Sequence, residues 1–290
     1  MKTPSKNRGI LFILLAAFCF SCMNAFVRLS GDVPTIQKSF FRNAVAFVIA
    51  AVILYRDHKG FRAASSKNWP LLLGRATFGT IGLLANFYAV DHLMLSDASM
   101  LNKMAPFFAV IASYFILKEK INVVQGVTLI GAFVGALFII KPTLSNMVLG
   151  PSLIGLMGGL CAGTAYTLVR LLGNRGERGP FIVFTFSGLS CLVALPFLLF
   201  DYHPMTLQQF AALMGAGLAA AGGQFSVTAA YTNAPARVIS VYDYSQVIFS
   251  AILGFFLFSD IPDVFSFLGY AIIIGMALIS FHYNNRRQPA

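Results

Sequence analysis

Ten stretches of about 20 mostly apolar residues, separated by short polar segments, constrain this chain more than any other feature of its sequence. A helix of that length spans the hydrocarbon core of a bilayer, because each residue rises about 1.5 Å along the helix axis. Hydrophobic residues make up 58% of the chain and charged residues 11%, far from the composition of a soluble domain. The sequence therefore predicts an all-α integral membrane protein with ten transmembrane helices. The expected spans begin near Ile10, Ile36, Trp69, Ala98, Val123, Ser152, Phe181, Leu207, Ala236 and Val264.

The distribution of basic residues predicts the orientation. Most of the 21 Lys and Arg residues fall in segments that would share one side of the membrane with the N-terminus. Because basic residues collect in short cytoplasmic loops, both termini are predicted to be cytoplasmic, in the inner or plasma membrane of the cell. The net charge of +11 then reflects topology and contact with anionic membrane lipid, and it is not evidence for nucleic-acid binding.

The beginning of the chain, MKTPSKNRGILFILLAAFCFS, has the basic head and apolar run of a signal peptide. Nine further spans follow it, so it is interpreted as an uncleaved first helix. The cysteines, Cys19, Cys22, Cys161 and Cys191, all lie inside expected spans, where packing is their favoured role. The CxxC pair lacks a second pair at metal-ligand spacing, and we expect no metal and no cofactor.

The two halves of the chain resemble each other. Short strings recur at a nearly constant separation: VRLSG (27–31) with VRLLG (169–173), Gly82 with Gly223, and FILKE ending at Glu119 with FLFSD ending at Asp260. Apolar helices share short strings by chance, so the inference depends on several matches keeping one register. The predicted repeats cover residues 9–141 and 150–283, with five spans each. Because five is odd, the second repeat enters the membrane from the opposite side, an architecture typical of secondary transporters.

Two charged residues lie inside expected spans at nearly the same position of the repeat. Lys103 is in the fourth span and Asp243 is in the ninth. A charge facing lipid costs several kcal/mol, so both side chains are expected to face the bundle interior or a wet cavity. A solute could bind between them, or they could form a structural salt bridge between the two helices. Asp243 could also be protonated at rest, and the sequence leaves these alternatives open.

Sparse polar side chains on other spans favour a cavity near this pair. Each shares a helix face with small or polar residues by the i, i+3, i+4 rule. Such stripes could equally form hydrogen bonds between helices, worth about 0.6 kcal/mol each. Arg42 and Arg75, near the ends of their spans, are expected to extend toward the lipid headgroups. The candidate substrate-binding residues are Asn24, Asn86, Lys103, Tyr166, Gln224, Tyr231, Asp243 and Tyr244.

Three stretches, FFRNAVAF, GLLANFYAVDHLMLSDASMLNKMAPFFAVIASYFILKEKI and ARVISVYDYSQVIFSAILGFFLFSDIPD, resemble the ten-helix EamA type of the drug/metabolite transporter superfamily. The shared features are Arg42, Pro106 and the acidic residues Glu119 and Asp260, and the resemblance covers nearly the whole chain. It implies two EamA repeats, a central cavity and alternating access to small organic solutes. The second repeat departs from the pattern, with Val247 in place of the proline and aspartate in place of glutamate. Lys103 is not part of the general pattern.

These observations predict a secondary transporter for a small organic metabolite. A zwitterion, such as an amino acid or a compound like S-adenosylmethionine, would suit Lys103 and Asp243, and Asp243 is the candidate for proton coupling. The alternatives are an exporter of drugs or nucleosides and a non-transporting sensor or scaffold. An enzyme is not expected, because no cluster of His, Asp, Glu or Cys lies near one membrane face. The expected partners are the solute and membrane lipid, with a homodimer left open.

Overall fold

The computed structural model describes residues 6–57, 60–92, 101–140, 149–259, 262 and 264–286. Regular secondary structure in this part of the chain is entirely helical. The elements are α1 (Lys6–Leu29), α2 (Thr35–Arg56), η1 (Ser66–Asn68), α3 (Trp69–His92), α5 (Ala105–Leu117), α6 (Val123–Ile140), α7 (Leu149–Asn174), α8 (Gly179–Phe200), α9 (Leu207–Asn233), α10 (Ala236–Asp243), α11 (Ser245–Phe258) and α12 (Val264–Arg286).

Seven helical segments in the described residues are long and apolar enough to cross a membrane. They are α1, α2, α7, α8, α9, α10 together with α11, and α12. Of the other expected spans, α5 and α6 are shorter apolar helices, and α3 carries Arg75 within it. Large apolar side chains cover the outside of the bundle; Val48 is 57% exposed and Phe256 is 76% exposed. A lipid environment accounts for this surface, and the chain is a multi-pass membrane protein.

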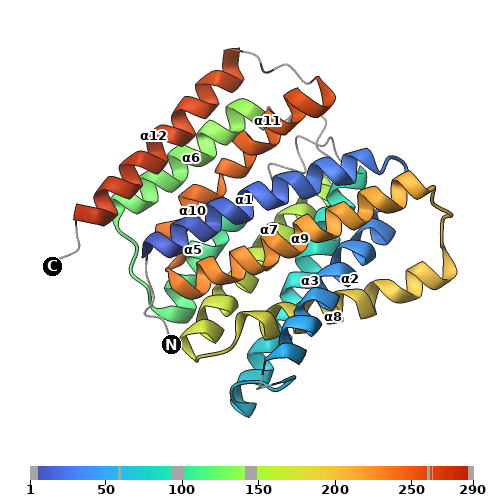
Figure 1. Cartoon of the computed structure of the whole chain (residues 1–290). Coiled ribbons are helices and arrows are strands. Elements are labelled where there is room, and N and C mark those ends of the chain that lie inside the picture. The colour runs from blue at the N-terminus through green and yellow to red at the C-terminus, as the bar shows by residue number, and fades with distance from the viewer. Residues whose placement is uncertain are drawn as a thin grey trace.

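Most of the large helix contacts join the first half of the chain to the second. α1 packs against α9 and α11, α3 packs against α7 and α8, and α2 packs against α8 and α9. α5 contacts α7, and α6 lies beside α12 at one side of the bundle (Figure 1). Helices far apart in the sequence therefore form the core together.

Glycines set the closest of these helix contacts. A Cβ on Gly163 of α7 would lie 2.6 Å from the backbone nitrogen of Ala109 and 2.7 Å from the carbonyl oxygen of Ala105, both on α5. A Cβ on Gly82 of α3 would lie 3.1 Å from the carbonyl oxygen of Gly158 on α7. Small residues let helix backbones approach each other, which is how helices gain packing energy in membranes.

Two of the expected spans have an interruption in their helical conformation. The helical conformation breaks at Lys103 and Met104, and again at Tyr244 between α10 and α11. Pro106 lies at the start of α5 and has no N–H to donate to the preceding turn, which favours the first break. The second break has no proline. The expected start of the fourth span at Ala98, and also Lys141 and Asp260, lie outside the described residues.

A buried carboxylate fastens the segment between α2 and α3 to the second half. Glu177 is 6% exposed, and its Oε2 accepts hydrogen bonds from the backbone N–H of Ala64 at 3.0 Å and from Asn68 Nδ2 at 2.9 Å. The neighbouring Arg178 Nη1 lies 2.6 Å from Asp57 Oδ2. These contacts fix how α3 enters the bundle, and with it the position of Arg75.

The glycine contact between α5 and α7 gives a test of the fold. We expect Gly163→Ala to destabilise the protein by about 1–3 kcal/mol, because the new methyl group would overlap the α5 backbone. The decrease appears as a lower Tm of the detergent-purified protein. Gly150→Ala on the same helix is the control, since nothing lies within 4 Å of a Cβ there. Equal Tm values for the two variants would contradict the close packing of α5 on α7.

Candidate functional site

A cavity of about 750 Å³ lies among α1, α2, α3, α7, α9 and α11. Its wall includes Gly31 and Asp32 from the connection between α1 and α2, and it extends inward to Arg75 and Gly79 of α3. The α1–α2 connection precedes α2, and the start of α3 follows it, so the two lie at opposite ends of α2. A cavity that includes both the connection and Arg75 near the start of α3 therefore reaches well into the bundle. Its volume falls within the usual range of about 300–1,000 Å³ for sites that hold small organic ligands.

Four of the eight candidate residues line this cavity. Asn24 comes from α1, Asn86 from α3, Tyr166 from α7 and Gln224 from α9. Each of the four side chains carries an amide or hydroxyl group among mostly apolar neighbours. Binding sites for small organic solutes commonly combine an apolar wall with a few separated polar groups.

Tyr231 of α9 lies behind the wall rather than in it. Its side chain is 1% exposed, and its ring stacks on Tyr166 with centroids 4.9 Å apart and an interplanar angle of 16°. Tyr231 therefore supports the orientation of Tyr166, which does line the cavity.

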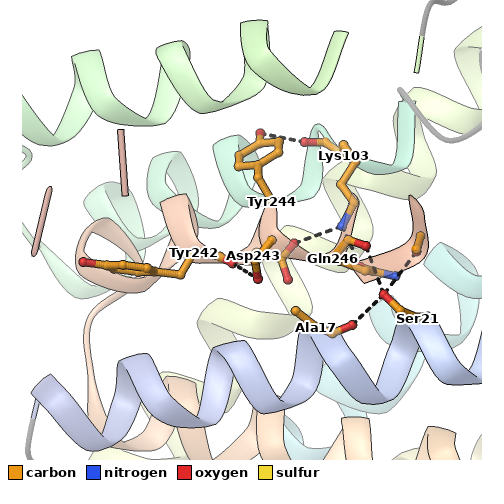
Figure 2. Close-up of polar contacts among 9 residues, drawn as sticks. Ala17, Ser21, Lys103, Tyr242, Asp243, Tyr244 and Gln246 are labelled. Carbon is orange, nitrogen blue, oxygen red and sulfur yellow. Dashed lines mark hydrogen bonds and ion pairs between the residues drawn. The ribbon is translucent and has the colours of Figure 1, made fainter. Parts of the chain in front are cut away.

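Lys103 and Asp243 form a direct ion pair. The Lys103 Nζ lies 3.4 Å from Asp243 Oδ2, and it donates a hydrogen bond of 2.6 Å to Gln246 Oε1 (Figure 2). Their side chains are 12% and 19% exposed. Neither residue is part of the cavity wall, whereas Gln246 is. The amide of Gln246 therefore connects the ion pair to the cavity.

The ion pair lies where the two interrupted helices meet. The Tyr244 hydroxyl, from the break between α10 and α11, donates to the Lys103 carbonyl oxygen at 2.9 Å (Figure 2). Ser21 of α1 donates to the Gln246 carbonyl oxygen at 3.0 Å. A break in a helix leaves backbone carbonyl groups without their helical hydrogen bonds, and inside a membrane these groups need other donors. The Tyr244 hydroxyl is the donor for one of them, the Lys103 carbonyl. Tyr244 is thus a structural link between the two breaks.

The cavity also contains two arginines that the sequence interpretation assigned to the lipid headgroups. That expectation is wrong for Arg75, which is 1% exposed, and Arg42 likewise lies in the cavity wall. The Arg75 guanidinium lies over the ring of Phe186 with Cζ 4.1 Å from the ring centroid. Gly79, one turn further along α3, leaves room for it, since a Cβ there would meet Arg75 Nη1. Arginine followed four residues later by glycine is the sequence signal that could have found this arrangement.

The opposite end of the bundle is closed by polar contacts around Arg170. Its Nη1 donates to the carbonyl oxygen of Thr232 at 3.1 Å, and its Nε lies 3.5 Å from Glu119 Oε1. These contacts join α7, the end of α9 and the segment after α5. In the described residues, the cavity therefore reaches the α1–α2 connection, whereas polar contacts join the helices at the end where α7 and α9 finish.

The described residues contain no group of three or more His, Cys, Asp and Glu side chains that could hold a metal ion. The cavity wall offers amides, hydroxyls, guanidinium groups, the ammonium group of Lys38 and the carboxylate of Asp32. This set of groups can bind a polar solute by hydrogen bonds and charge.

Comparison with known proteins identifies related sequences over most of the chain. The EamA-like transporter family matches residues 7–141 and 150–281. The pseudopaline exporter CntI of Pseudomonas aeruginosa (strain UCBPP-PA14) is 32% identical over 268 residues, covering 92% of this chain and 93% of the exporter. A riboflavin transporter of Brucella anthropi is 24% identical over 275 residues, covering 92% and 95% of the two chains. These names indicate a membrane transporter rather than an enzyme.

One solved structure has the same fold. It superposes with a TM-score of 0.84 at 15% sequence identity, and the match covers 98% of this chain and 100% of the other. At this identity the likeness shows the fold alone.

The ion pair gives a second test. We expect Lys103→Met or Asp243→Leu alone to lower the stability by up to about 3 kcal/mol, because each leaves one charge without its partner inside the bundle. The double variant should recover much of the loss. Tm values of the four proteins form a double-mutant cycle, and additive effects would show that the two side chains do not interact.

Proposed function

Because the chain belongs to the EamA-like transporter family, we propose that it is a secondary transporter that moves a small organic solute across the cell membrane by alternating access. The observation that carries this proposal is the cavity of about 750 Å³, which in the described residues reaches the α1–α2 connection, while the contacts of Arg170 join the helices at the other end. A solute that enters the open end meets Asn24, Asn86, Tyr166 and Gln224, the proposed substrate-binding residues of the wall. Reversing which end is closed would release it on the other side.

Such a reversal requires two arrangements of similar energy, and two inverted five-helix repeats would provide them. Three matches support this internal symmetry. The helix breaks at Lys103 and Tyr244 are as many positions apart as the matching residues Glu119 and Asp260 of the two halves. Lys118 and Ser259, with the same separation again, both have a left-handed backbone with φ of 57°. Contacts also correspond, since α1 packs on α9 and α11 while α7 packs on α3 and α5.

The direction in which the cavity opens follows from the proposed orientation. With both termini in the cytoplasm, the α1–α2 connection lies outside, so the structure is an outward-open state. The contacts of Arg170 with Glu119 and Thr232 then close the cytoplasmic side. The name of the Pseudomonas aeruginosa relative favours export as the direction of transport in this chain.

A zwitterionic solute fits this proposal if it can separate Lys103 from Asp243. Lys103 and Asp243 already neutralise each other at 3.4 Å, so a zwitterion must separate them to bind between them. An amino acid or a compound like S-adenosylmethionine could do so through Gln246, which reaches both the wall and the Lys103 Nζ. An uncharged drug or nucleoside would leave the pair intact. A sensor or scaffold would not move solute at all.

Inside-out membrane vesicles with the full-length protein, energised and incubated with a mixture of cell metabolites, test the function. We expect vesicles with the protein to accumulate specific metabolites, identified by mass spectrometry, over vesicles without it. Gln224→Ala should lower accumulation about tenfold or more, because a hydrogen bond to a bound solute is lost. Thr164→Ala is the control, since its hydroxyl is exposed and bonds only within α7 at 2.9 Å. If no metabolite accumulates, the proposal of transport is wrong.

Proton coupling through Asp243 is tested in the same vesicles. If protonation of Asp243 releases Lys103 during the cycle, accumulation should follow an imposed pH gradient, and Asp243→Asn should abolish this dependence. Accumulation that ignores the gradient in the native protein would leave exchange or facilitated diffusion as the mechanism.

A further inference from the structure

Arg42 and Arg75 are two cations in the cavity wall that lack anionic partners among the described residues. No ion pair or hydrogen bond joins either guanidinium to a described side chain, and the Nε of each is buried without a hydrogen-bond partner. Arg75 has its aromatic contact with Phe186 and is otherwise enclosed, at 1% exposure. Both arginines and Tyr166 line the same cavity.

This arrangement is unfavourable for the empty protein. Removing a guanidinium from water costs several kcal/mol, and a second cation nearby adds repulsion. The aromatic contact of Arg75 offsets about 0.5–2 kcal/mol of this cost. Lys103 shows how the same bundle treats a charge with a structural role, because that cation has both a carboxylate and an amide oxygen within reach. Buried N–H groups without hydrogen-bond partners, on cations without an anionic partner, are typical of a binding site.

We propose that Arg42 and Arg75 together bind an oxyanion of the transported solute, a carboxylate or a phosphate group. This inference rests on the proposed transport function and names the charge that the cavity selects. Guanidinium groups bind oxyanions through parallel N–H···O contacts, and the two arginines come from neighbouring helices that face one cavity.

In this arrangement Arg42 and Arg75, rather than Lys103, bind the anionic group of the solute. The amides of Asn24, Asn86 and Gln224, and the hydroxyl of Tyr166, would then contact the remainder of the solute. Asp32 is a carboxylate of the same wall, ten positions before Arg42 in the sequence. Among the described residues, no ion pair joins it to either arginine.

Thermal unfolding of the purified full-length protein tests the proposal with defined probes at low millimolar concentration. The probes are succinate and glutamate as carboxylates, glycerol 3-phosphate as a phosphate ester, and glycerol as the uncharged comparison, all at equal ionic strength with chloride. We expect at least one oxyanion probe to raise the Tm by about 2 °C or more, because it binds the folded state. The response to succinate or to glycerol 3-phosphate distinguishes the two oxyanions.

The increase should be lost in Arg42→Gln and Arg75→Gln and retained in Arg175→Gln, a matched control because Arg175 is exposed at the end of α7. Arg42→Lys and Arg75→Lys keep the charge without the planar fork, and we expect them to reduce affinity about ten- to hundredfold. We also expect Arg75→Gln without probe to be at least as stable as the native protein, since an uncompensated charge has been removed. Marked destabilisation there would instead indicate a structural role and contradict the proposal.

The vesicle assay separates this inference from the proposed function. Accumulated metabolites that are anionic, and that fail to accumulate in both Gln variants, support the inference. Accumulation of uncharged or cationic metabolites, unchanged in those variants, would leave transport intact and overturn the oxyanion site. The oxyanion site would also be overturned if the probes raised the Tm of all variants equally, or if they did not raise the Tm of the native protein.

Discussion

The cost of keeping a charge away from water inside a lipid-embedded bundle governs the rest of this structure. The bundle contains two solutions to that problem. Lys103 is neutralised within the protein by Asp243 and Gln246. Arg42 and Arg75 line a cavity, where the proposed oxyanion of the solute would compensate their charge. If the arginines bind the solute as proposed, basic residues hold helices together in one part of the bundle and bind the solute in another.

Backbone hydrogen bonding imposes the second constraint. A helix break deep in the bundle leaves carbonyl and amide groups without partners, which lipid cannot satisfy. Here the break at Lys103 lies against the break at Tyr244, and the Tyr244 hydroxyl supplies a donor to the Lys103 carbonyl oxygen. The ion pair forms beside that contact, so side-chain charge and backbone polarity are satisfied together. This clustering explains why neither break needs to be exposed to lipid.

Several of these features could be predicted from the sequence. The length of the apolar runs predicts the helices, because a bilayer permits few other structures, and the position of Lys103 and Asp243 in the two halves predicts their proximity. Asn24, Asn86, Tyr166 and Gln224 could be selected as polar residues on apolar helices. The direction of Arg75 could not, because it depends on Phe186 of α8 and on the space that Gly79 leaves. The interruption at Tyr244 has no proline to signal it, and it depends on a contact with a residue more than a hundred positions away.

The way the helices pair across the two halves has a consequence for biosynthesis. The largest contacts of α1, α2, α3 and α6 are with α9, α8, α7 and α12, all of which are made later by the ribosome. The first half is therefore inserted into the membrane before its packing partners are synthesised. Until then its polar groups that become buried, such as Arg75, remain in the lipid or in the insertion machinery. A chain interrupted in the middle would leave α1, α2, α3 and α6 without their main packing partners. Quality control of this protein in the cell should thus act on unpaired early helices, and coexpressed halves should assemble only by finding each other within the bilayer.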